Sequence, residues 1–298
     1  MKKIHISLFL VYTIALSACT VEQGGPSPTP TPTPIPTFQP VASERAVIVN
    51  DLERSYLLHT PPDLNNQQPV PVIFAFHGYS ITPMGMQYAT RMDEVADHEK
   101  FLVVYPKGIE FSWNTGREEG THGGYALAHN VDEPAFIRQI LSDLDTFTNI
   151  DLKRIYAMGH SQGGMVVYRL GCEMSDTFSA IASVAGVHLL SDCNPTQAVS
   201  VIHIHMLSDP YVPFSGGGSF DFPSVEEGIE TWVELNKCTS SEKEEDKTNG
   251  ITHITYAPCQ AGTAVELYTI DSGRHDWPRT KMPASEIIWE FFAAHPMP

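Results

Sequence analysis

Short apolar runs alternate with helical patterns along the chain from about residue 41 onward. Six of these runs are nearly continuously apolar and rich in β-branched residues, which predicts short strands that are covered on both faces. They span residues 70–78, 101–106, 154–160, 178–186, 199–207 and 264–270.

Two of the intervening segments have the apolar periodicity of helices with one buried face. The segment 132–147 places one stripe on Phe136, Ile137, Ile140, Leu141 and Leu144, and the segment 284–292 places one on Ala284, Ile287, Ile288, Phe291 and Phe292. Strands alternating with helices predict an α/β fold, with a mostly parallel central sheet and helices on both faces. The segment 46–61 has no intervening helix and predicts an antiparallel hairpin at the sheet edge.

The N-terminal residues have the pattern of an export signal. Lys2 and Lys3 precede an apolar run over residues 4–16, which is too short to span a bilayer. The run ends in Leu-Ser-Ala-Cys, which resembles the lipobox of a bacterial lipoprotein signal. It implies a signal peptide over residues 1–18, cleavage before Cys19, lipidation of that thiol, and a membrane as partner. A plain secretory signal with a chance cysteine is the alternative.

A proline-rich segment separates the signal from the body of the chain. Proline fixes φ and removes a backbone donor, so the proline-rich residues 24–40 can build neither a helix nor a sheet ladder. They form most of the predicted tether over residues 19–42. We expect a stiff tether that extends up to about 70 Å at roughly 3.1 Å per residue, and a catalytic domain over residues 43–298. The sequence therefore predicts a domain at the cell surface or outside the cell, anchored to a bacterial membrane.

Charge and cysteine content narrow the partners and the compartment. Loss of the signal leaves 16 basic and 35 acidic residues, so the formal net charge changes from −17 to −19. This argues against nucleic acid as a partner. Four cysteines remain in an oxidising compartment and allow three pairings. We favour Cys238 with Cys259 and Cys172 with Cys193, the alternative being a free, buried Cys172.

One serine lies where a predicted strand turns into a predicted helix. Gly159, Ser161 and Gly163 form the pattern G-x-S-x-G in that setting, which is typical of a nucleophile elbow. Glycines allow the sharp turn, and the first N–H groups of the helix point to where an oxyanion would form. The alternative is an ordinary strand-to-helix turn, because glycine and serine are common residues.

A nucleophilic serine requires a histidine base and a carboxylate to orient it. In an α/β-hydrolase fold these follow in the order serine, acid, histidine. Asp209 comes just after one predicted strand, and His275 lies in the loop after the next, so both are candidates. The competing acids are Asp192, Asp221, Asp271 and Asp276, which fit the expected order or position less well.

A second oxyanion donor is expected from the loop after an early strand. His77 and Gly78 end such a strand, so the backbone N–H groups of Tyr79 and Gln162 are the candidate pair. In the alternative interpretation, Gly78 only turns the chain.

Several stretches together resemble the secreted polyhydroxybutyrate depolymerase and feruloyl esterase-like group of α/β-hydrolases. The resemblance runs from about Ser55 to Pro278 and includes HGYS, the pair Trp113-Asn114, the elbow segment, VIHIHMLSDPYVPFSGG and GRHDWP. It implies serine esterase activity on feruloyl or acetyl esters of polysaccharides or on a polyester. Ser161 would be the nucleophile, with Asp209 and His275 as its partners.

The sequence departs from this group in two places. The usual HGTAD reads HMLSD, so Met206 replaces a glycine, and the glycine that usually follows HDWP is absent. Both changes put the substrate in doubt more than the chemistry. Trp113 and Trp277 are candidates for lining the cleft, although tryptophans are more often packing residues.

Other features are assigned plain structural roles. His203 and His205 point to one face of a strand, but no third metal ligand is evident, so we expect neither a metal nor another cofactor. Residues 240–250 predict a solvated loop tip. Two rival functions remain open: a non-catalytic, carbohydrate-binding surface protein, which would not turn over a nitrophenyl ester, and a serine peptidase, which would cleave peptides.

Overall fold

The computed structural model describes residues 42–65, 68–117 and 123–298. The predicted signal peptide, the lipidation site at Cys19 and nearly all of the predicted tether lie outside the described residues. The first strand begins at Ala42, one residue before the predicted start of the catalytic domain. In the described part of the chain, no helix is both long and apolar enough to cross a membrane.

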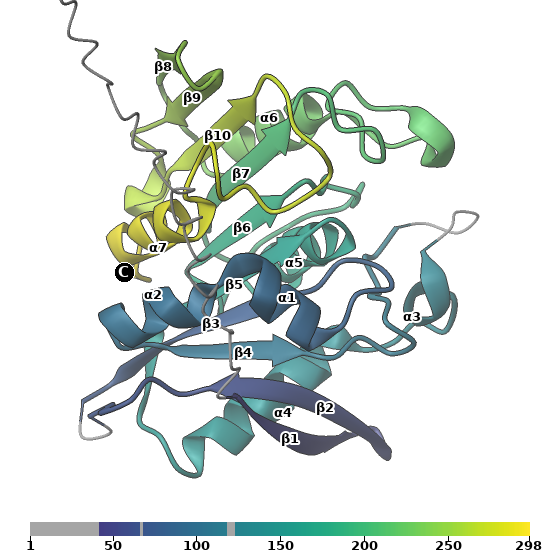
Figure 1. Ribbon diagram of the computed structural model, residues 1–298, viewed down its shortest axis with the longest axis vertical. Helices are drawn as coiled ribbons and strands as arrows, with labels where there is room; N and C mark the ends of the chain where they lie inside the picture. The colour runs from purple at the N-terminus through teal and green to yellow at the C-terminus, as the bar shows by residue number, and fades with distance from the viewer. Residues whose placement is uncertain (1–41, 66–67, 118–122) are drawn as a thin grey trace, which may run out of the picture. The chain divides into compact units, whose positions relative to one another are not determined.

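The central element is a ten-stranded sheet with the order β1-β2-β4-β3-β5-β6-β7-β10-β9-β8 (Figure 1). Its strands are β1 (Ala42–Val49), β2 (Leu52–His59), β3 (Val70–Phe76), β4 (Leu102–Pro106), β5 (Ile150–His160), β6 (Ala180–Val184), β7 (Ser200–Met206), β8 (Ser241–Asp246), β9 (Ile251–Tyr256) and β10 (Val265–Ile270). The six strands from β4 to β10 in this order are parallel. Their carboxyl ends therefore share one edge, as predicted.

Antiparallel strands extend the parallel core on both sides. The hairpin of β1 and β2 lies at one edge, which confirms the prediction from residues 46–61. At the other edge, β8 and β9 form a second hairpin. The predicted loop tip over residues 240–250 is thus wrong in its backbone, because β8 pairs along its whole length with β9. The side chains of β8 are all exposed, as expected of an edge strand that is rich in charged residues.

Helices cover both faces of the sheet, because successive side chains of each inner strand point to opposite sides. Along β3, for example, Phe74 and Phe76 belong to one core, and Ile73 and Ala75 belong to the other. The described helices longer than one turn are α1 (Pro83–Thr90), α2 (Met92–Glu99), α3 (Gly124–Ala128), α4 (Glu133–Asp145), α5 (Gln162–Glu173), α6 (Val225–Leu235) and α7 (Ala284–Ala294).

The two cores divide the longer helices between the two faces. Helices α4, α5 and α6 pack with the first core, whereas α1, α2 and α7 pack with the second (Figure 1). The predicted apolar stripes face these cores, except that Leu141 and Ile287 are only partly buried. The mostly parallel sheet with helices on both faces is therefore confirmed.

Two disulfides join the pairs that the sequence analysis favoured. Cys172 in α5 bonds Cys193, and Cys238 after α6 bonds Cys259. The alternative of a free Cys172 is therefore wrong. Each bridge closes a loop with a sequence separation of 21 residues, which on the chain-entropy account stabilises the fold by about 3 kcal/mol.

Buried histidines make the fold sensitive to acid. Burial lowers the pKa of both His77 and His188 to about 4. In the unfolded chain a histidine has a pKa of about 6.5, so below that pH only the unfolded state gains a proton. Each histidine therefore costs no unfolding free energy above about pH 6.5. As the pH falls from 6.5 to 4, each one progressively lowers the free energy of unfolding.

We expect His188→Gln to flatten this dependence. In the wild type, the buried His188 should lower the free energy of unfolding by about 2 kcal/mol between pH 7 and pH 5. Glutamine does not titrate, so the variant should not lose this amount. Denaturant unfolding at pH 7 and pH 5 measures it. His98→Gln is the matched control, because the His98 side chain is 83% exposed and should leave the difference unchanged. Equal pH differences in His188→Gln and the wild type would contradict the prediction.

Candidate active site

Ser161 sits at the sharp turn between β5 and α5. Its backbone has φ 56° and ψ −120°, which is a strained conformation for a residue with a side chain. The Ser161 N–H donates to the carbonyl oxygen of Val184 at 2.9 Å, and the Ser161 carbonyl accepts from Met165 inside the first turn of α5. This is the strand-turn-helix setting that the nucleophile-elbow interpretation requires.

The two flanking glycines are needed because backbone approaches backbone at this turn. A Cβ atom at Gly159 would lie 2.1 Å from the carbonyl oxygen of Gly163, and one at Gly163 would lie 2.1 Å from that of Phe76. Neither neighbour is a flexible side chain that could move aside. The pattern G-x-S-x-G is thus imposed by the close packing of β3, β5 and α5.

We expect Gly163→Ala to destabilise the protein by about 3 kcal/mol or more, because the backbone of β3 must shift to relieve the clash. Denaturant unfolding measures the loss. Gly217→Ala is the control, since nothing lies within 4 Å of its added Cβ. Its φ of 79° alone should cost about 1 to 2 kcal/mol. A loss in Gly163→Ala no larger than in the control would show that the turn tolerates a side chain.

Asp209 and His275 are in direct contact. The Nδ1 atom of His275 lies 2.6 Å from Oδ2 of Asp209. Because an ionised carboxylate only accepts, Nδ1 carries a proton, and in the neutral ring Nε2 is then the nitrogen that can accept one. The other oxygen, Oδ1, accepts from the backbone N–H groups of Tyr211 at 2.8 Å and Val212 at 3.0 Å. Among the described residues, none of the competing aspartates forms a hydrogen bond with His275.

These contacts keep the Asp209 carboxylate ionised. Burial of Asp209 raises its pKa, but the hydrogen bonds from His275 and from the Val212 and Tyr211 backbone outweigh that effect and lower the pKa below its usual 3.8. A second ring, that of His160, has its centroid 5.0 Å from that of His275. Desolvation lowers the pKa of His160 to about 3, so this neighbour stays neutral.

His203 and His205 form a hydrogen-bonded chain behind the Asp209 loop. His205 Nε2 lies 2.8 Å from the Val212 carbonyl, which can only accept, so this nitrogen carries the proton. His205 Nδ1 therefore accepts from His203 Nε2 at 3.0 Å, and His203 Nδ1 accepts from the Tyr168 hydroxyl at 2.7 Å. These contacts agree with the structural role expected of both histidines. Through the Val212 carbonyl they also support the segment whose backbone N–H groups donate to Asp209.

A cavity of about 680 Å³ opens beside Ser161 and His275. Tyr79 and Gln162 also line it, as expected of the residues whose N–H groups were predicted to bind an oxyanion. Within the described residues, neither of these two N–H groups donates to a backbone carbonyl.

The two tryptophans proposed to line the cleft do not line this cavity, so that expectation is wrong. Trp113 is fully buried, and its indole N–H donates to the His77 carbonyl at 2.8 Å. Trp277 is 6% exposed and donates to the Ser285 hydroxyl at 3.0 Å. Both rings are buried in the core, and each indole N–H is satisfied by its own hydrogen bond.

Other residues, which the sequence analysis missed, form the walls of the cavity. The apolar wall consists of Met165, Leu189, Val212, Phe220 and Phe222, and Tyr211 lies at its side. Arg117 also lines the cavity and donates to the carbonyls of Phe220 and Asp221 at 2.6 and 3.0 Å. The phenylalanines follow a glycine-rich turn whose path the sequence does not fix, so only their proximity to the Asp209 segment could have pointed to them.

Comparisons with known proteins show the family of this chain. Residues 51–277 match the family model Esterase, described as "Putative esterase". The chain is 26% identical over 298 residues to Probable feruloyl esterase C of Aspergillus niger, covering 97% of this chain and 98% of that protein. It is 25% identical over 231 residues to the bifunctional acetylxylan esterase/xylanase XynS20E of Neocallimastix patriciarum, covering 74% of this chain but only 30% of that protein.

A solved structure shows the same fold. The acetyl xylan esterase from Aspergillus awamori superimposes with a TM-score of 0.60 at 14% identity, covering 85% of this chain and 99% of that one. At this identity the likeness speaks for the fold alone. Together with the sheet order, it confirms the predicted α/β-hydrolase fold.

Proposed function

Because the chain belongs to the Esterase family, and is therefore a carboxylic ester hydrolase, we propose that it is a serine esterase that acts through an acyl-enzyme on Ser161. The observation that carries this proposal is the 2.6 Å contact between His275 and Asp209 at a cavity that Ser161 and His275 line together. Asp209 would be the orienting acid and His275 the base.

In the first step, Ser161 Oγ attacks the ester carbonyl as His275 Nε2 takes its proton. The carbonyl oxygen becomes an oxyanion, which the N–H groups of Tyr79 and Gln162 would bind, and the ionised Asp209 stabilises the imidazolium. The C–O bond to the alcohol then breaks, and the alcohol leaves with the proton from His275. The acyl group remains bonded to Ser161.

In the second step, a water molecule takes the place of the alcohol. It gives a proton to His275 and attacks the acyl carbon, and the oxyanion forms in the same position. Collapse of this intermediate breaks the bond to Ser161 Oγ, which regains the proton from His275. The free acid leaves, and the enzyme returns to its starting state.

The size and lining of the cavity favour esters with a bulky aromatic acyl group. Cavities of about 300–1,000 Å³ typically enclose ligands of drug size. An acetyl group alone would not fill such a cavity. The apolar and aromatic wall formed by Met165, Phe220 and Phe222 suits a planar ring. A feruloyl-type ester of a polysaccharide is therefore the proposed substrate, and the A. niger relative is likewise named a probable feruloyl esterase.

Acetylated xylan is the second candidate, because XynS20E and the A. awamori structure both carry acetylxylan esterase names. Parallel assays of methyl ferulate, acetylated xylan and polyhydroxybutyrate film separate the substrates. We expect kcat/KM for methyl ferulate to exceed that for methyl acetate, which has the same alcohol. Preference for the acetyl ester would overturn the aromatic assignment, and no turnover of any ester would overturn the esterase itself.

We also propose that the enzyme acts outside the cell, anchored by a lipid on Cys19. The two disulfides support an oxidising compartment, and the Leu-Ser-Ala-Cys sequence supports the anchor. Detergent partitioning of the full chain expressed in a bacterium tests the anchor. The wild type should enter the detergent phase and Cys19→Ala the aqueous phase, whereas the same aqueous partitioning of both would contradict lipidation.

A further inference from the structure

We propose that Trp113 is a positioning residue that holds the two N–H donors of the oxyanion hole in register. This inference rests on the proposed function. Trp113 makes two hydrogen bonds toward these donors: its backbone N–H donates to Gln162 itself, and its indole N–H donates to His77, two residues before Tyr79. It does so from a fully buried position beside the cavity, without lining it.

The indole controls the Tyr79 side of the hole through His77. The indole N–H donates to the His77 carbonyl, and the two rings pack with centroids 4.8 Å apart. The Gly108 N–H donates to His77 Nε2 at 3.0 Å, so Nδ1 carries the proton and donates to the Gly78 carbonyl at 2.8 Å. That carbonyl shares one planar peptide unit with the Tyr79 N–H, so fixing the carbonyl fixes the direction of the donor.

The Trp113 backbone controls the Gln162 side. Its N–H donates to Oε1 of Gln162 at 3.1 Å, and Nε2 of Gln162 donates to the Gly123 carbonyl at 2.8 Å. Both ends of this side chain are therefore bound to loops outside α5. Gln162 is the first residue of α5. Fixing its side chain therefore also limits the movement of its backbone N–H.

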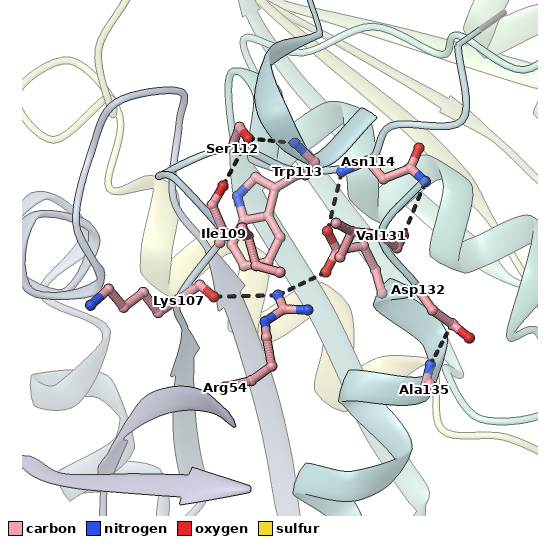
Figure 2. Close-up of polar contacts among 12 residues, drawn as sticks. Arg54, Lys107, Ile109, Ser112, Trp113, Asn114, Val131, Asp132 and Ala135 are labelled. Atoms are coloured by element: carbon pink, nitrogen blue, oxygen red, sulfur yellow. Dashed lines mark hydrogen bonds and ion pairs between the residues drawn. The ribbon is translucent and has the colours of Figure 1, made fainter. Parts of the chain in front are cut away.

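Polar contacts anchor the residues on either side of Trp113, and one of them is a buried ion pair that involves Arg54 (Figure 2). Glu133, the first residue of α4, accepts from Arg54 of β2 at 3.0 Å and from the Asn114 N–H at 3.2 Å. The Glu133 side chain is fully buried, and that of Arg54 is 3% exposed. On the other side of Trp113, the Ser112 hydroxyl donates to the Ile109 carbonyl and accepts from the Ala126 N–H. Trp113 thus stands between two anchored neighbours.

Positioning and packing predict different results for Trp113→Phe. Phenylalanine keeps a ring against Phe76 and His77 but removes the indole donor. We expect kcat to fall about 10- to 100-fold, as for a donor that is misaligned but not deleted. KM should change less than about 2-fold, because the hole binds the transition state more than the substrate.

The matched control is Trp232→Phe. Trp232, on α6, is also fully buried, its indole N–H donates to His188, and neither residue lines the cavity. We expect this variant to lower the melting temperature while kcat per active site stays within about 2-fold of the wild type. Titration with a fluorophosphonate counts the active sites in every preparation, so partial unfolding does not count as slower chemistry.

A boronic acid inhibitor gives the readout that packing alone would not move. Its adduct with Ser161 places an oxygen in the oxyanion hole, so its affinity should fall in Trp113→Phe by about the same factor as kcat. Gln162→Met, which keeps the backbone N–H but loses both side-chain bonds, should behave alike and serves if Trp113→Phe does not fold. The double variant should lose less than the product of the two factors, because both act on one hole.

An unchanged kcat per titrated site in Trp113→Phe, or in Gln162→Met if only that variant folds, would overturn the positioning role. So would a lower kcat with unchanged boronate affinity. The proposed function is tested separately, by wild-type turnover and its loss in Ser161→Ala. A wild type that is inactive on every ester therefore overturns the esterase, whereas an active enzyme with an unaffected Trp113→Phe overturns only the inference about Trp113.

Discussion

Replacing Ser161 with alanine is expected to lower kcat by about 10⁶-fold, the loss seen when the nucleophile of a comparable triad is removed. The reason is that the Ser161 hydroxyl supplies the oxygen of the proposed acyl-enzyme, which alanine lacks. The fold should be retained, because alanine needs no more room than serine at the same strained backbone. Initial rates with a nitrophenyl ester measure the loss, and thermal unfolding checks the fold.

Ser272→Ala is the control for this variant, since the Ser272 side chain is exposed and accepts a hydrogen bond from Lys281 at 2.8 Å. It should keep full activity. Residual turnover in Ser161→Ala within about 100-fold of the wild type would mean that the hydroxyl is not the nucleophile.

Asp209→Asn is expected to lower kcat by about 10⁴-fold, as in a serine-histidine-aspartate enzyme altered in the same way. Oδ1 of Asp209 accepts from two backbone N–H groups, so the amide oxygen of asparagine must take that place. Its NH₂ group then faces His275 Nδ1, which becomes an acceptor. The proton moves to Nε2, where the imidazole can no longer take a proton from Ser161.

Asp276→Asn tests the same charge change next to His275. Asp276 is exposed and was a competing candidate for the acid. We expect its kcat to stay within a few-fold of the wild type, on the scale of surface substitutions. If Asp276→Asn loses more activity than Asp209→Asn, the assignment of the acid is wrong.

The fold and the elbow were predictable because both rest on local signals. Continuous apolar runs identified the inner strands, and the clash at Gly159 and Gly163 explains why the turn at Ser161 is visible as a five-residue pattern. The contact between Asp209 and His275 followed from chain order and from the shared sheet edge. Even Met206, where the resemblance led us to expect a glycine, is buried in the core and leaves that contact in place.

Other features depended on contacts far apart in the sequence. Trp113 reads as a cleft residue from its position, but the structure bonds it to His77 and Gln162, which lie 36 and 49 residues away. The charged run in β8 predicts a loop from sequence alone, because both faces of this strand are exposed and it lacks the alternation of apolar and polar residues that identifies a strand. The cavity wall at Phe220 and Phe222 depends on the path of a glycine-rich turn, which composition does not determine.

The most direct measurement of the central claim is mass spectrometry of the enzyme quenched with acid during the first turnover of a nitrophenyl ester. The account predicts about one acyl group per active site, carried by the peptide that contains Ser161 and absent from Ser161→Ala. A burst of nitrophenol whose acyl group is found on any other residue, or turnover without a detectable acylated peptide under conditions where deacylation is slow, would contradict it.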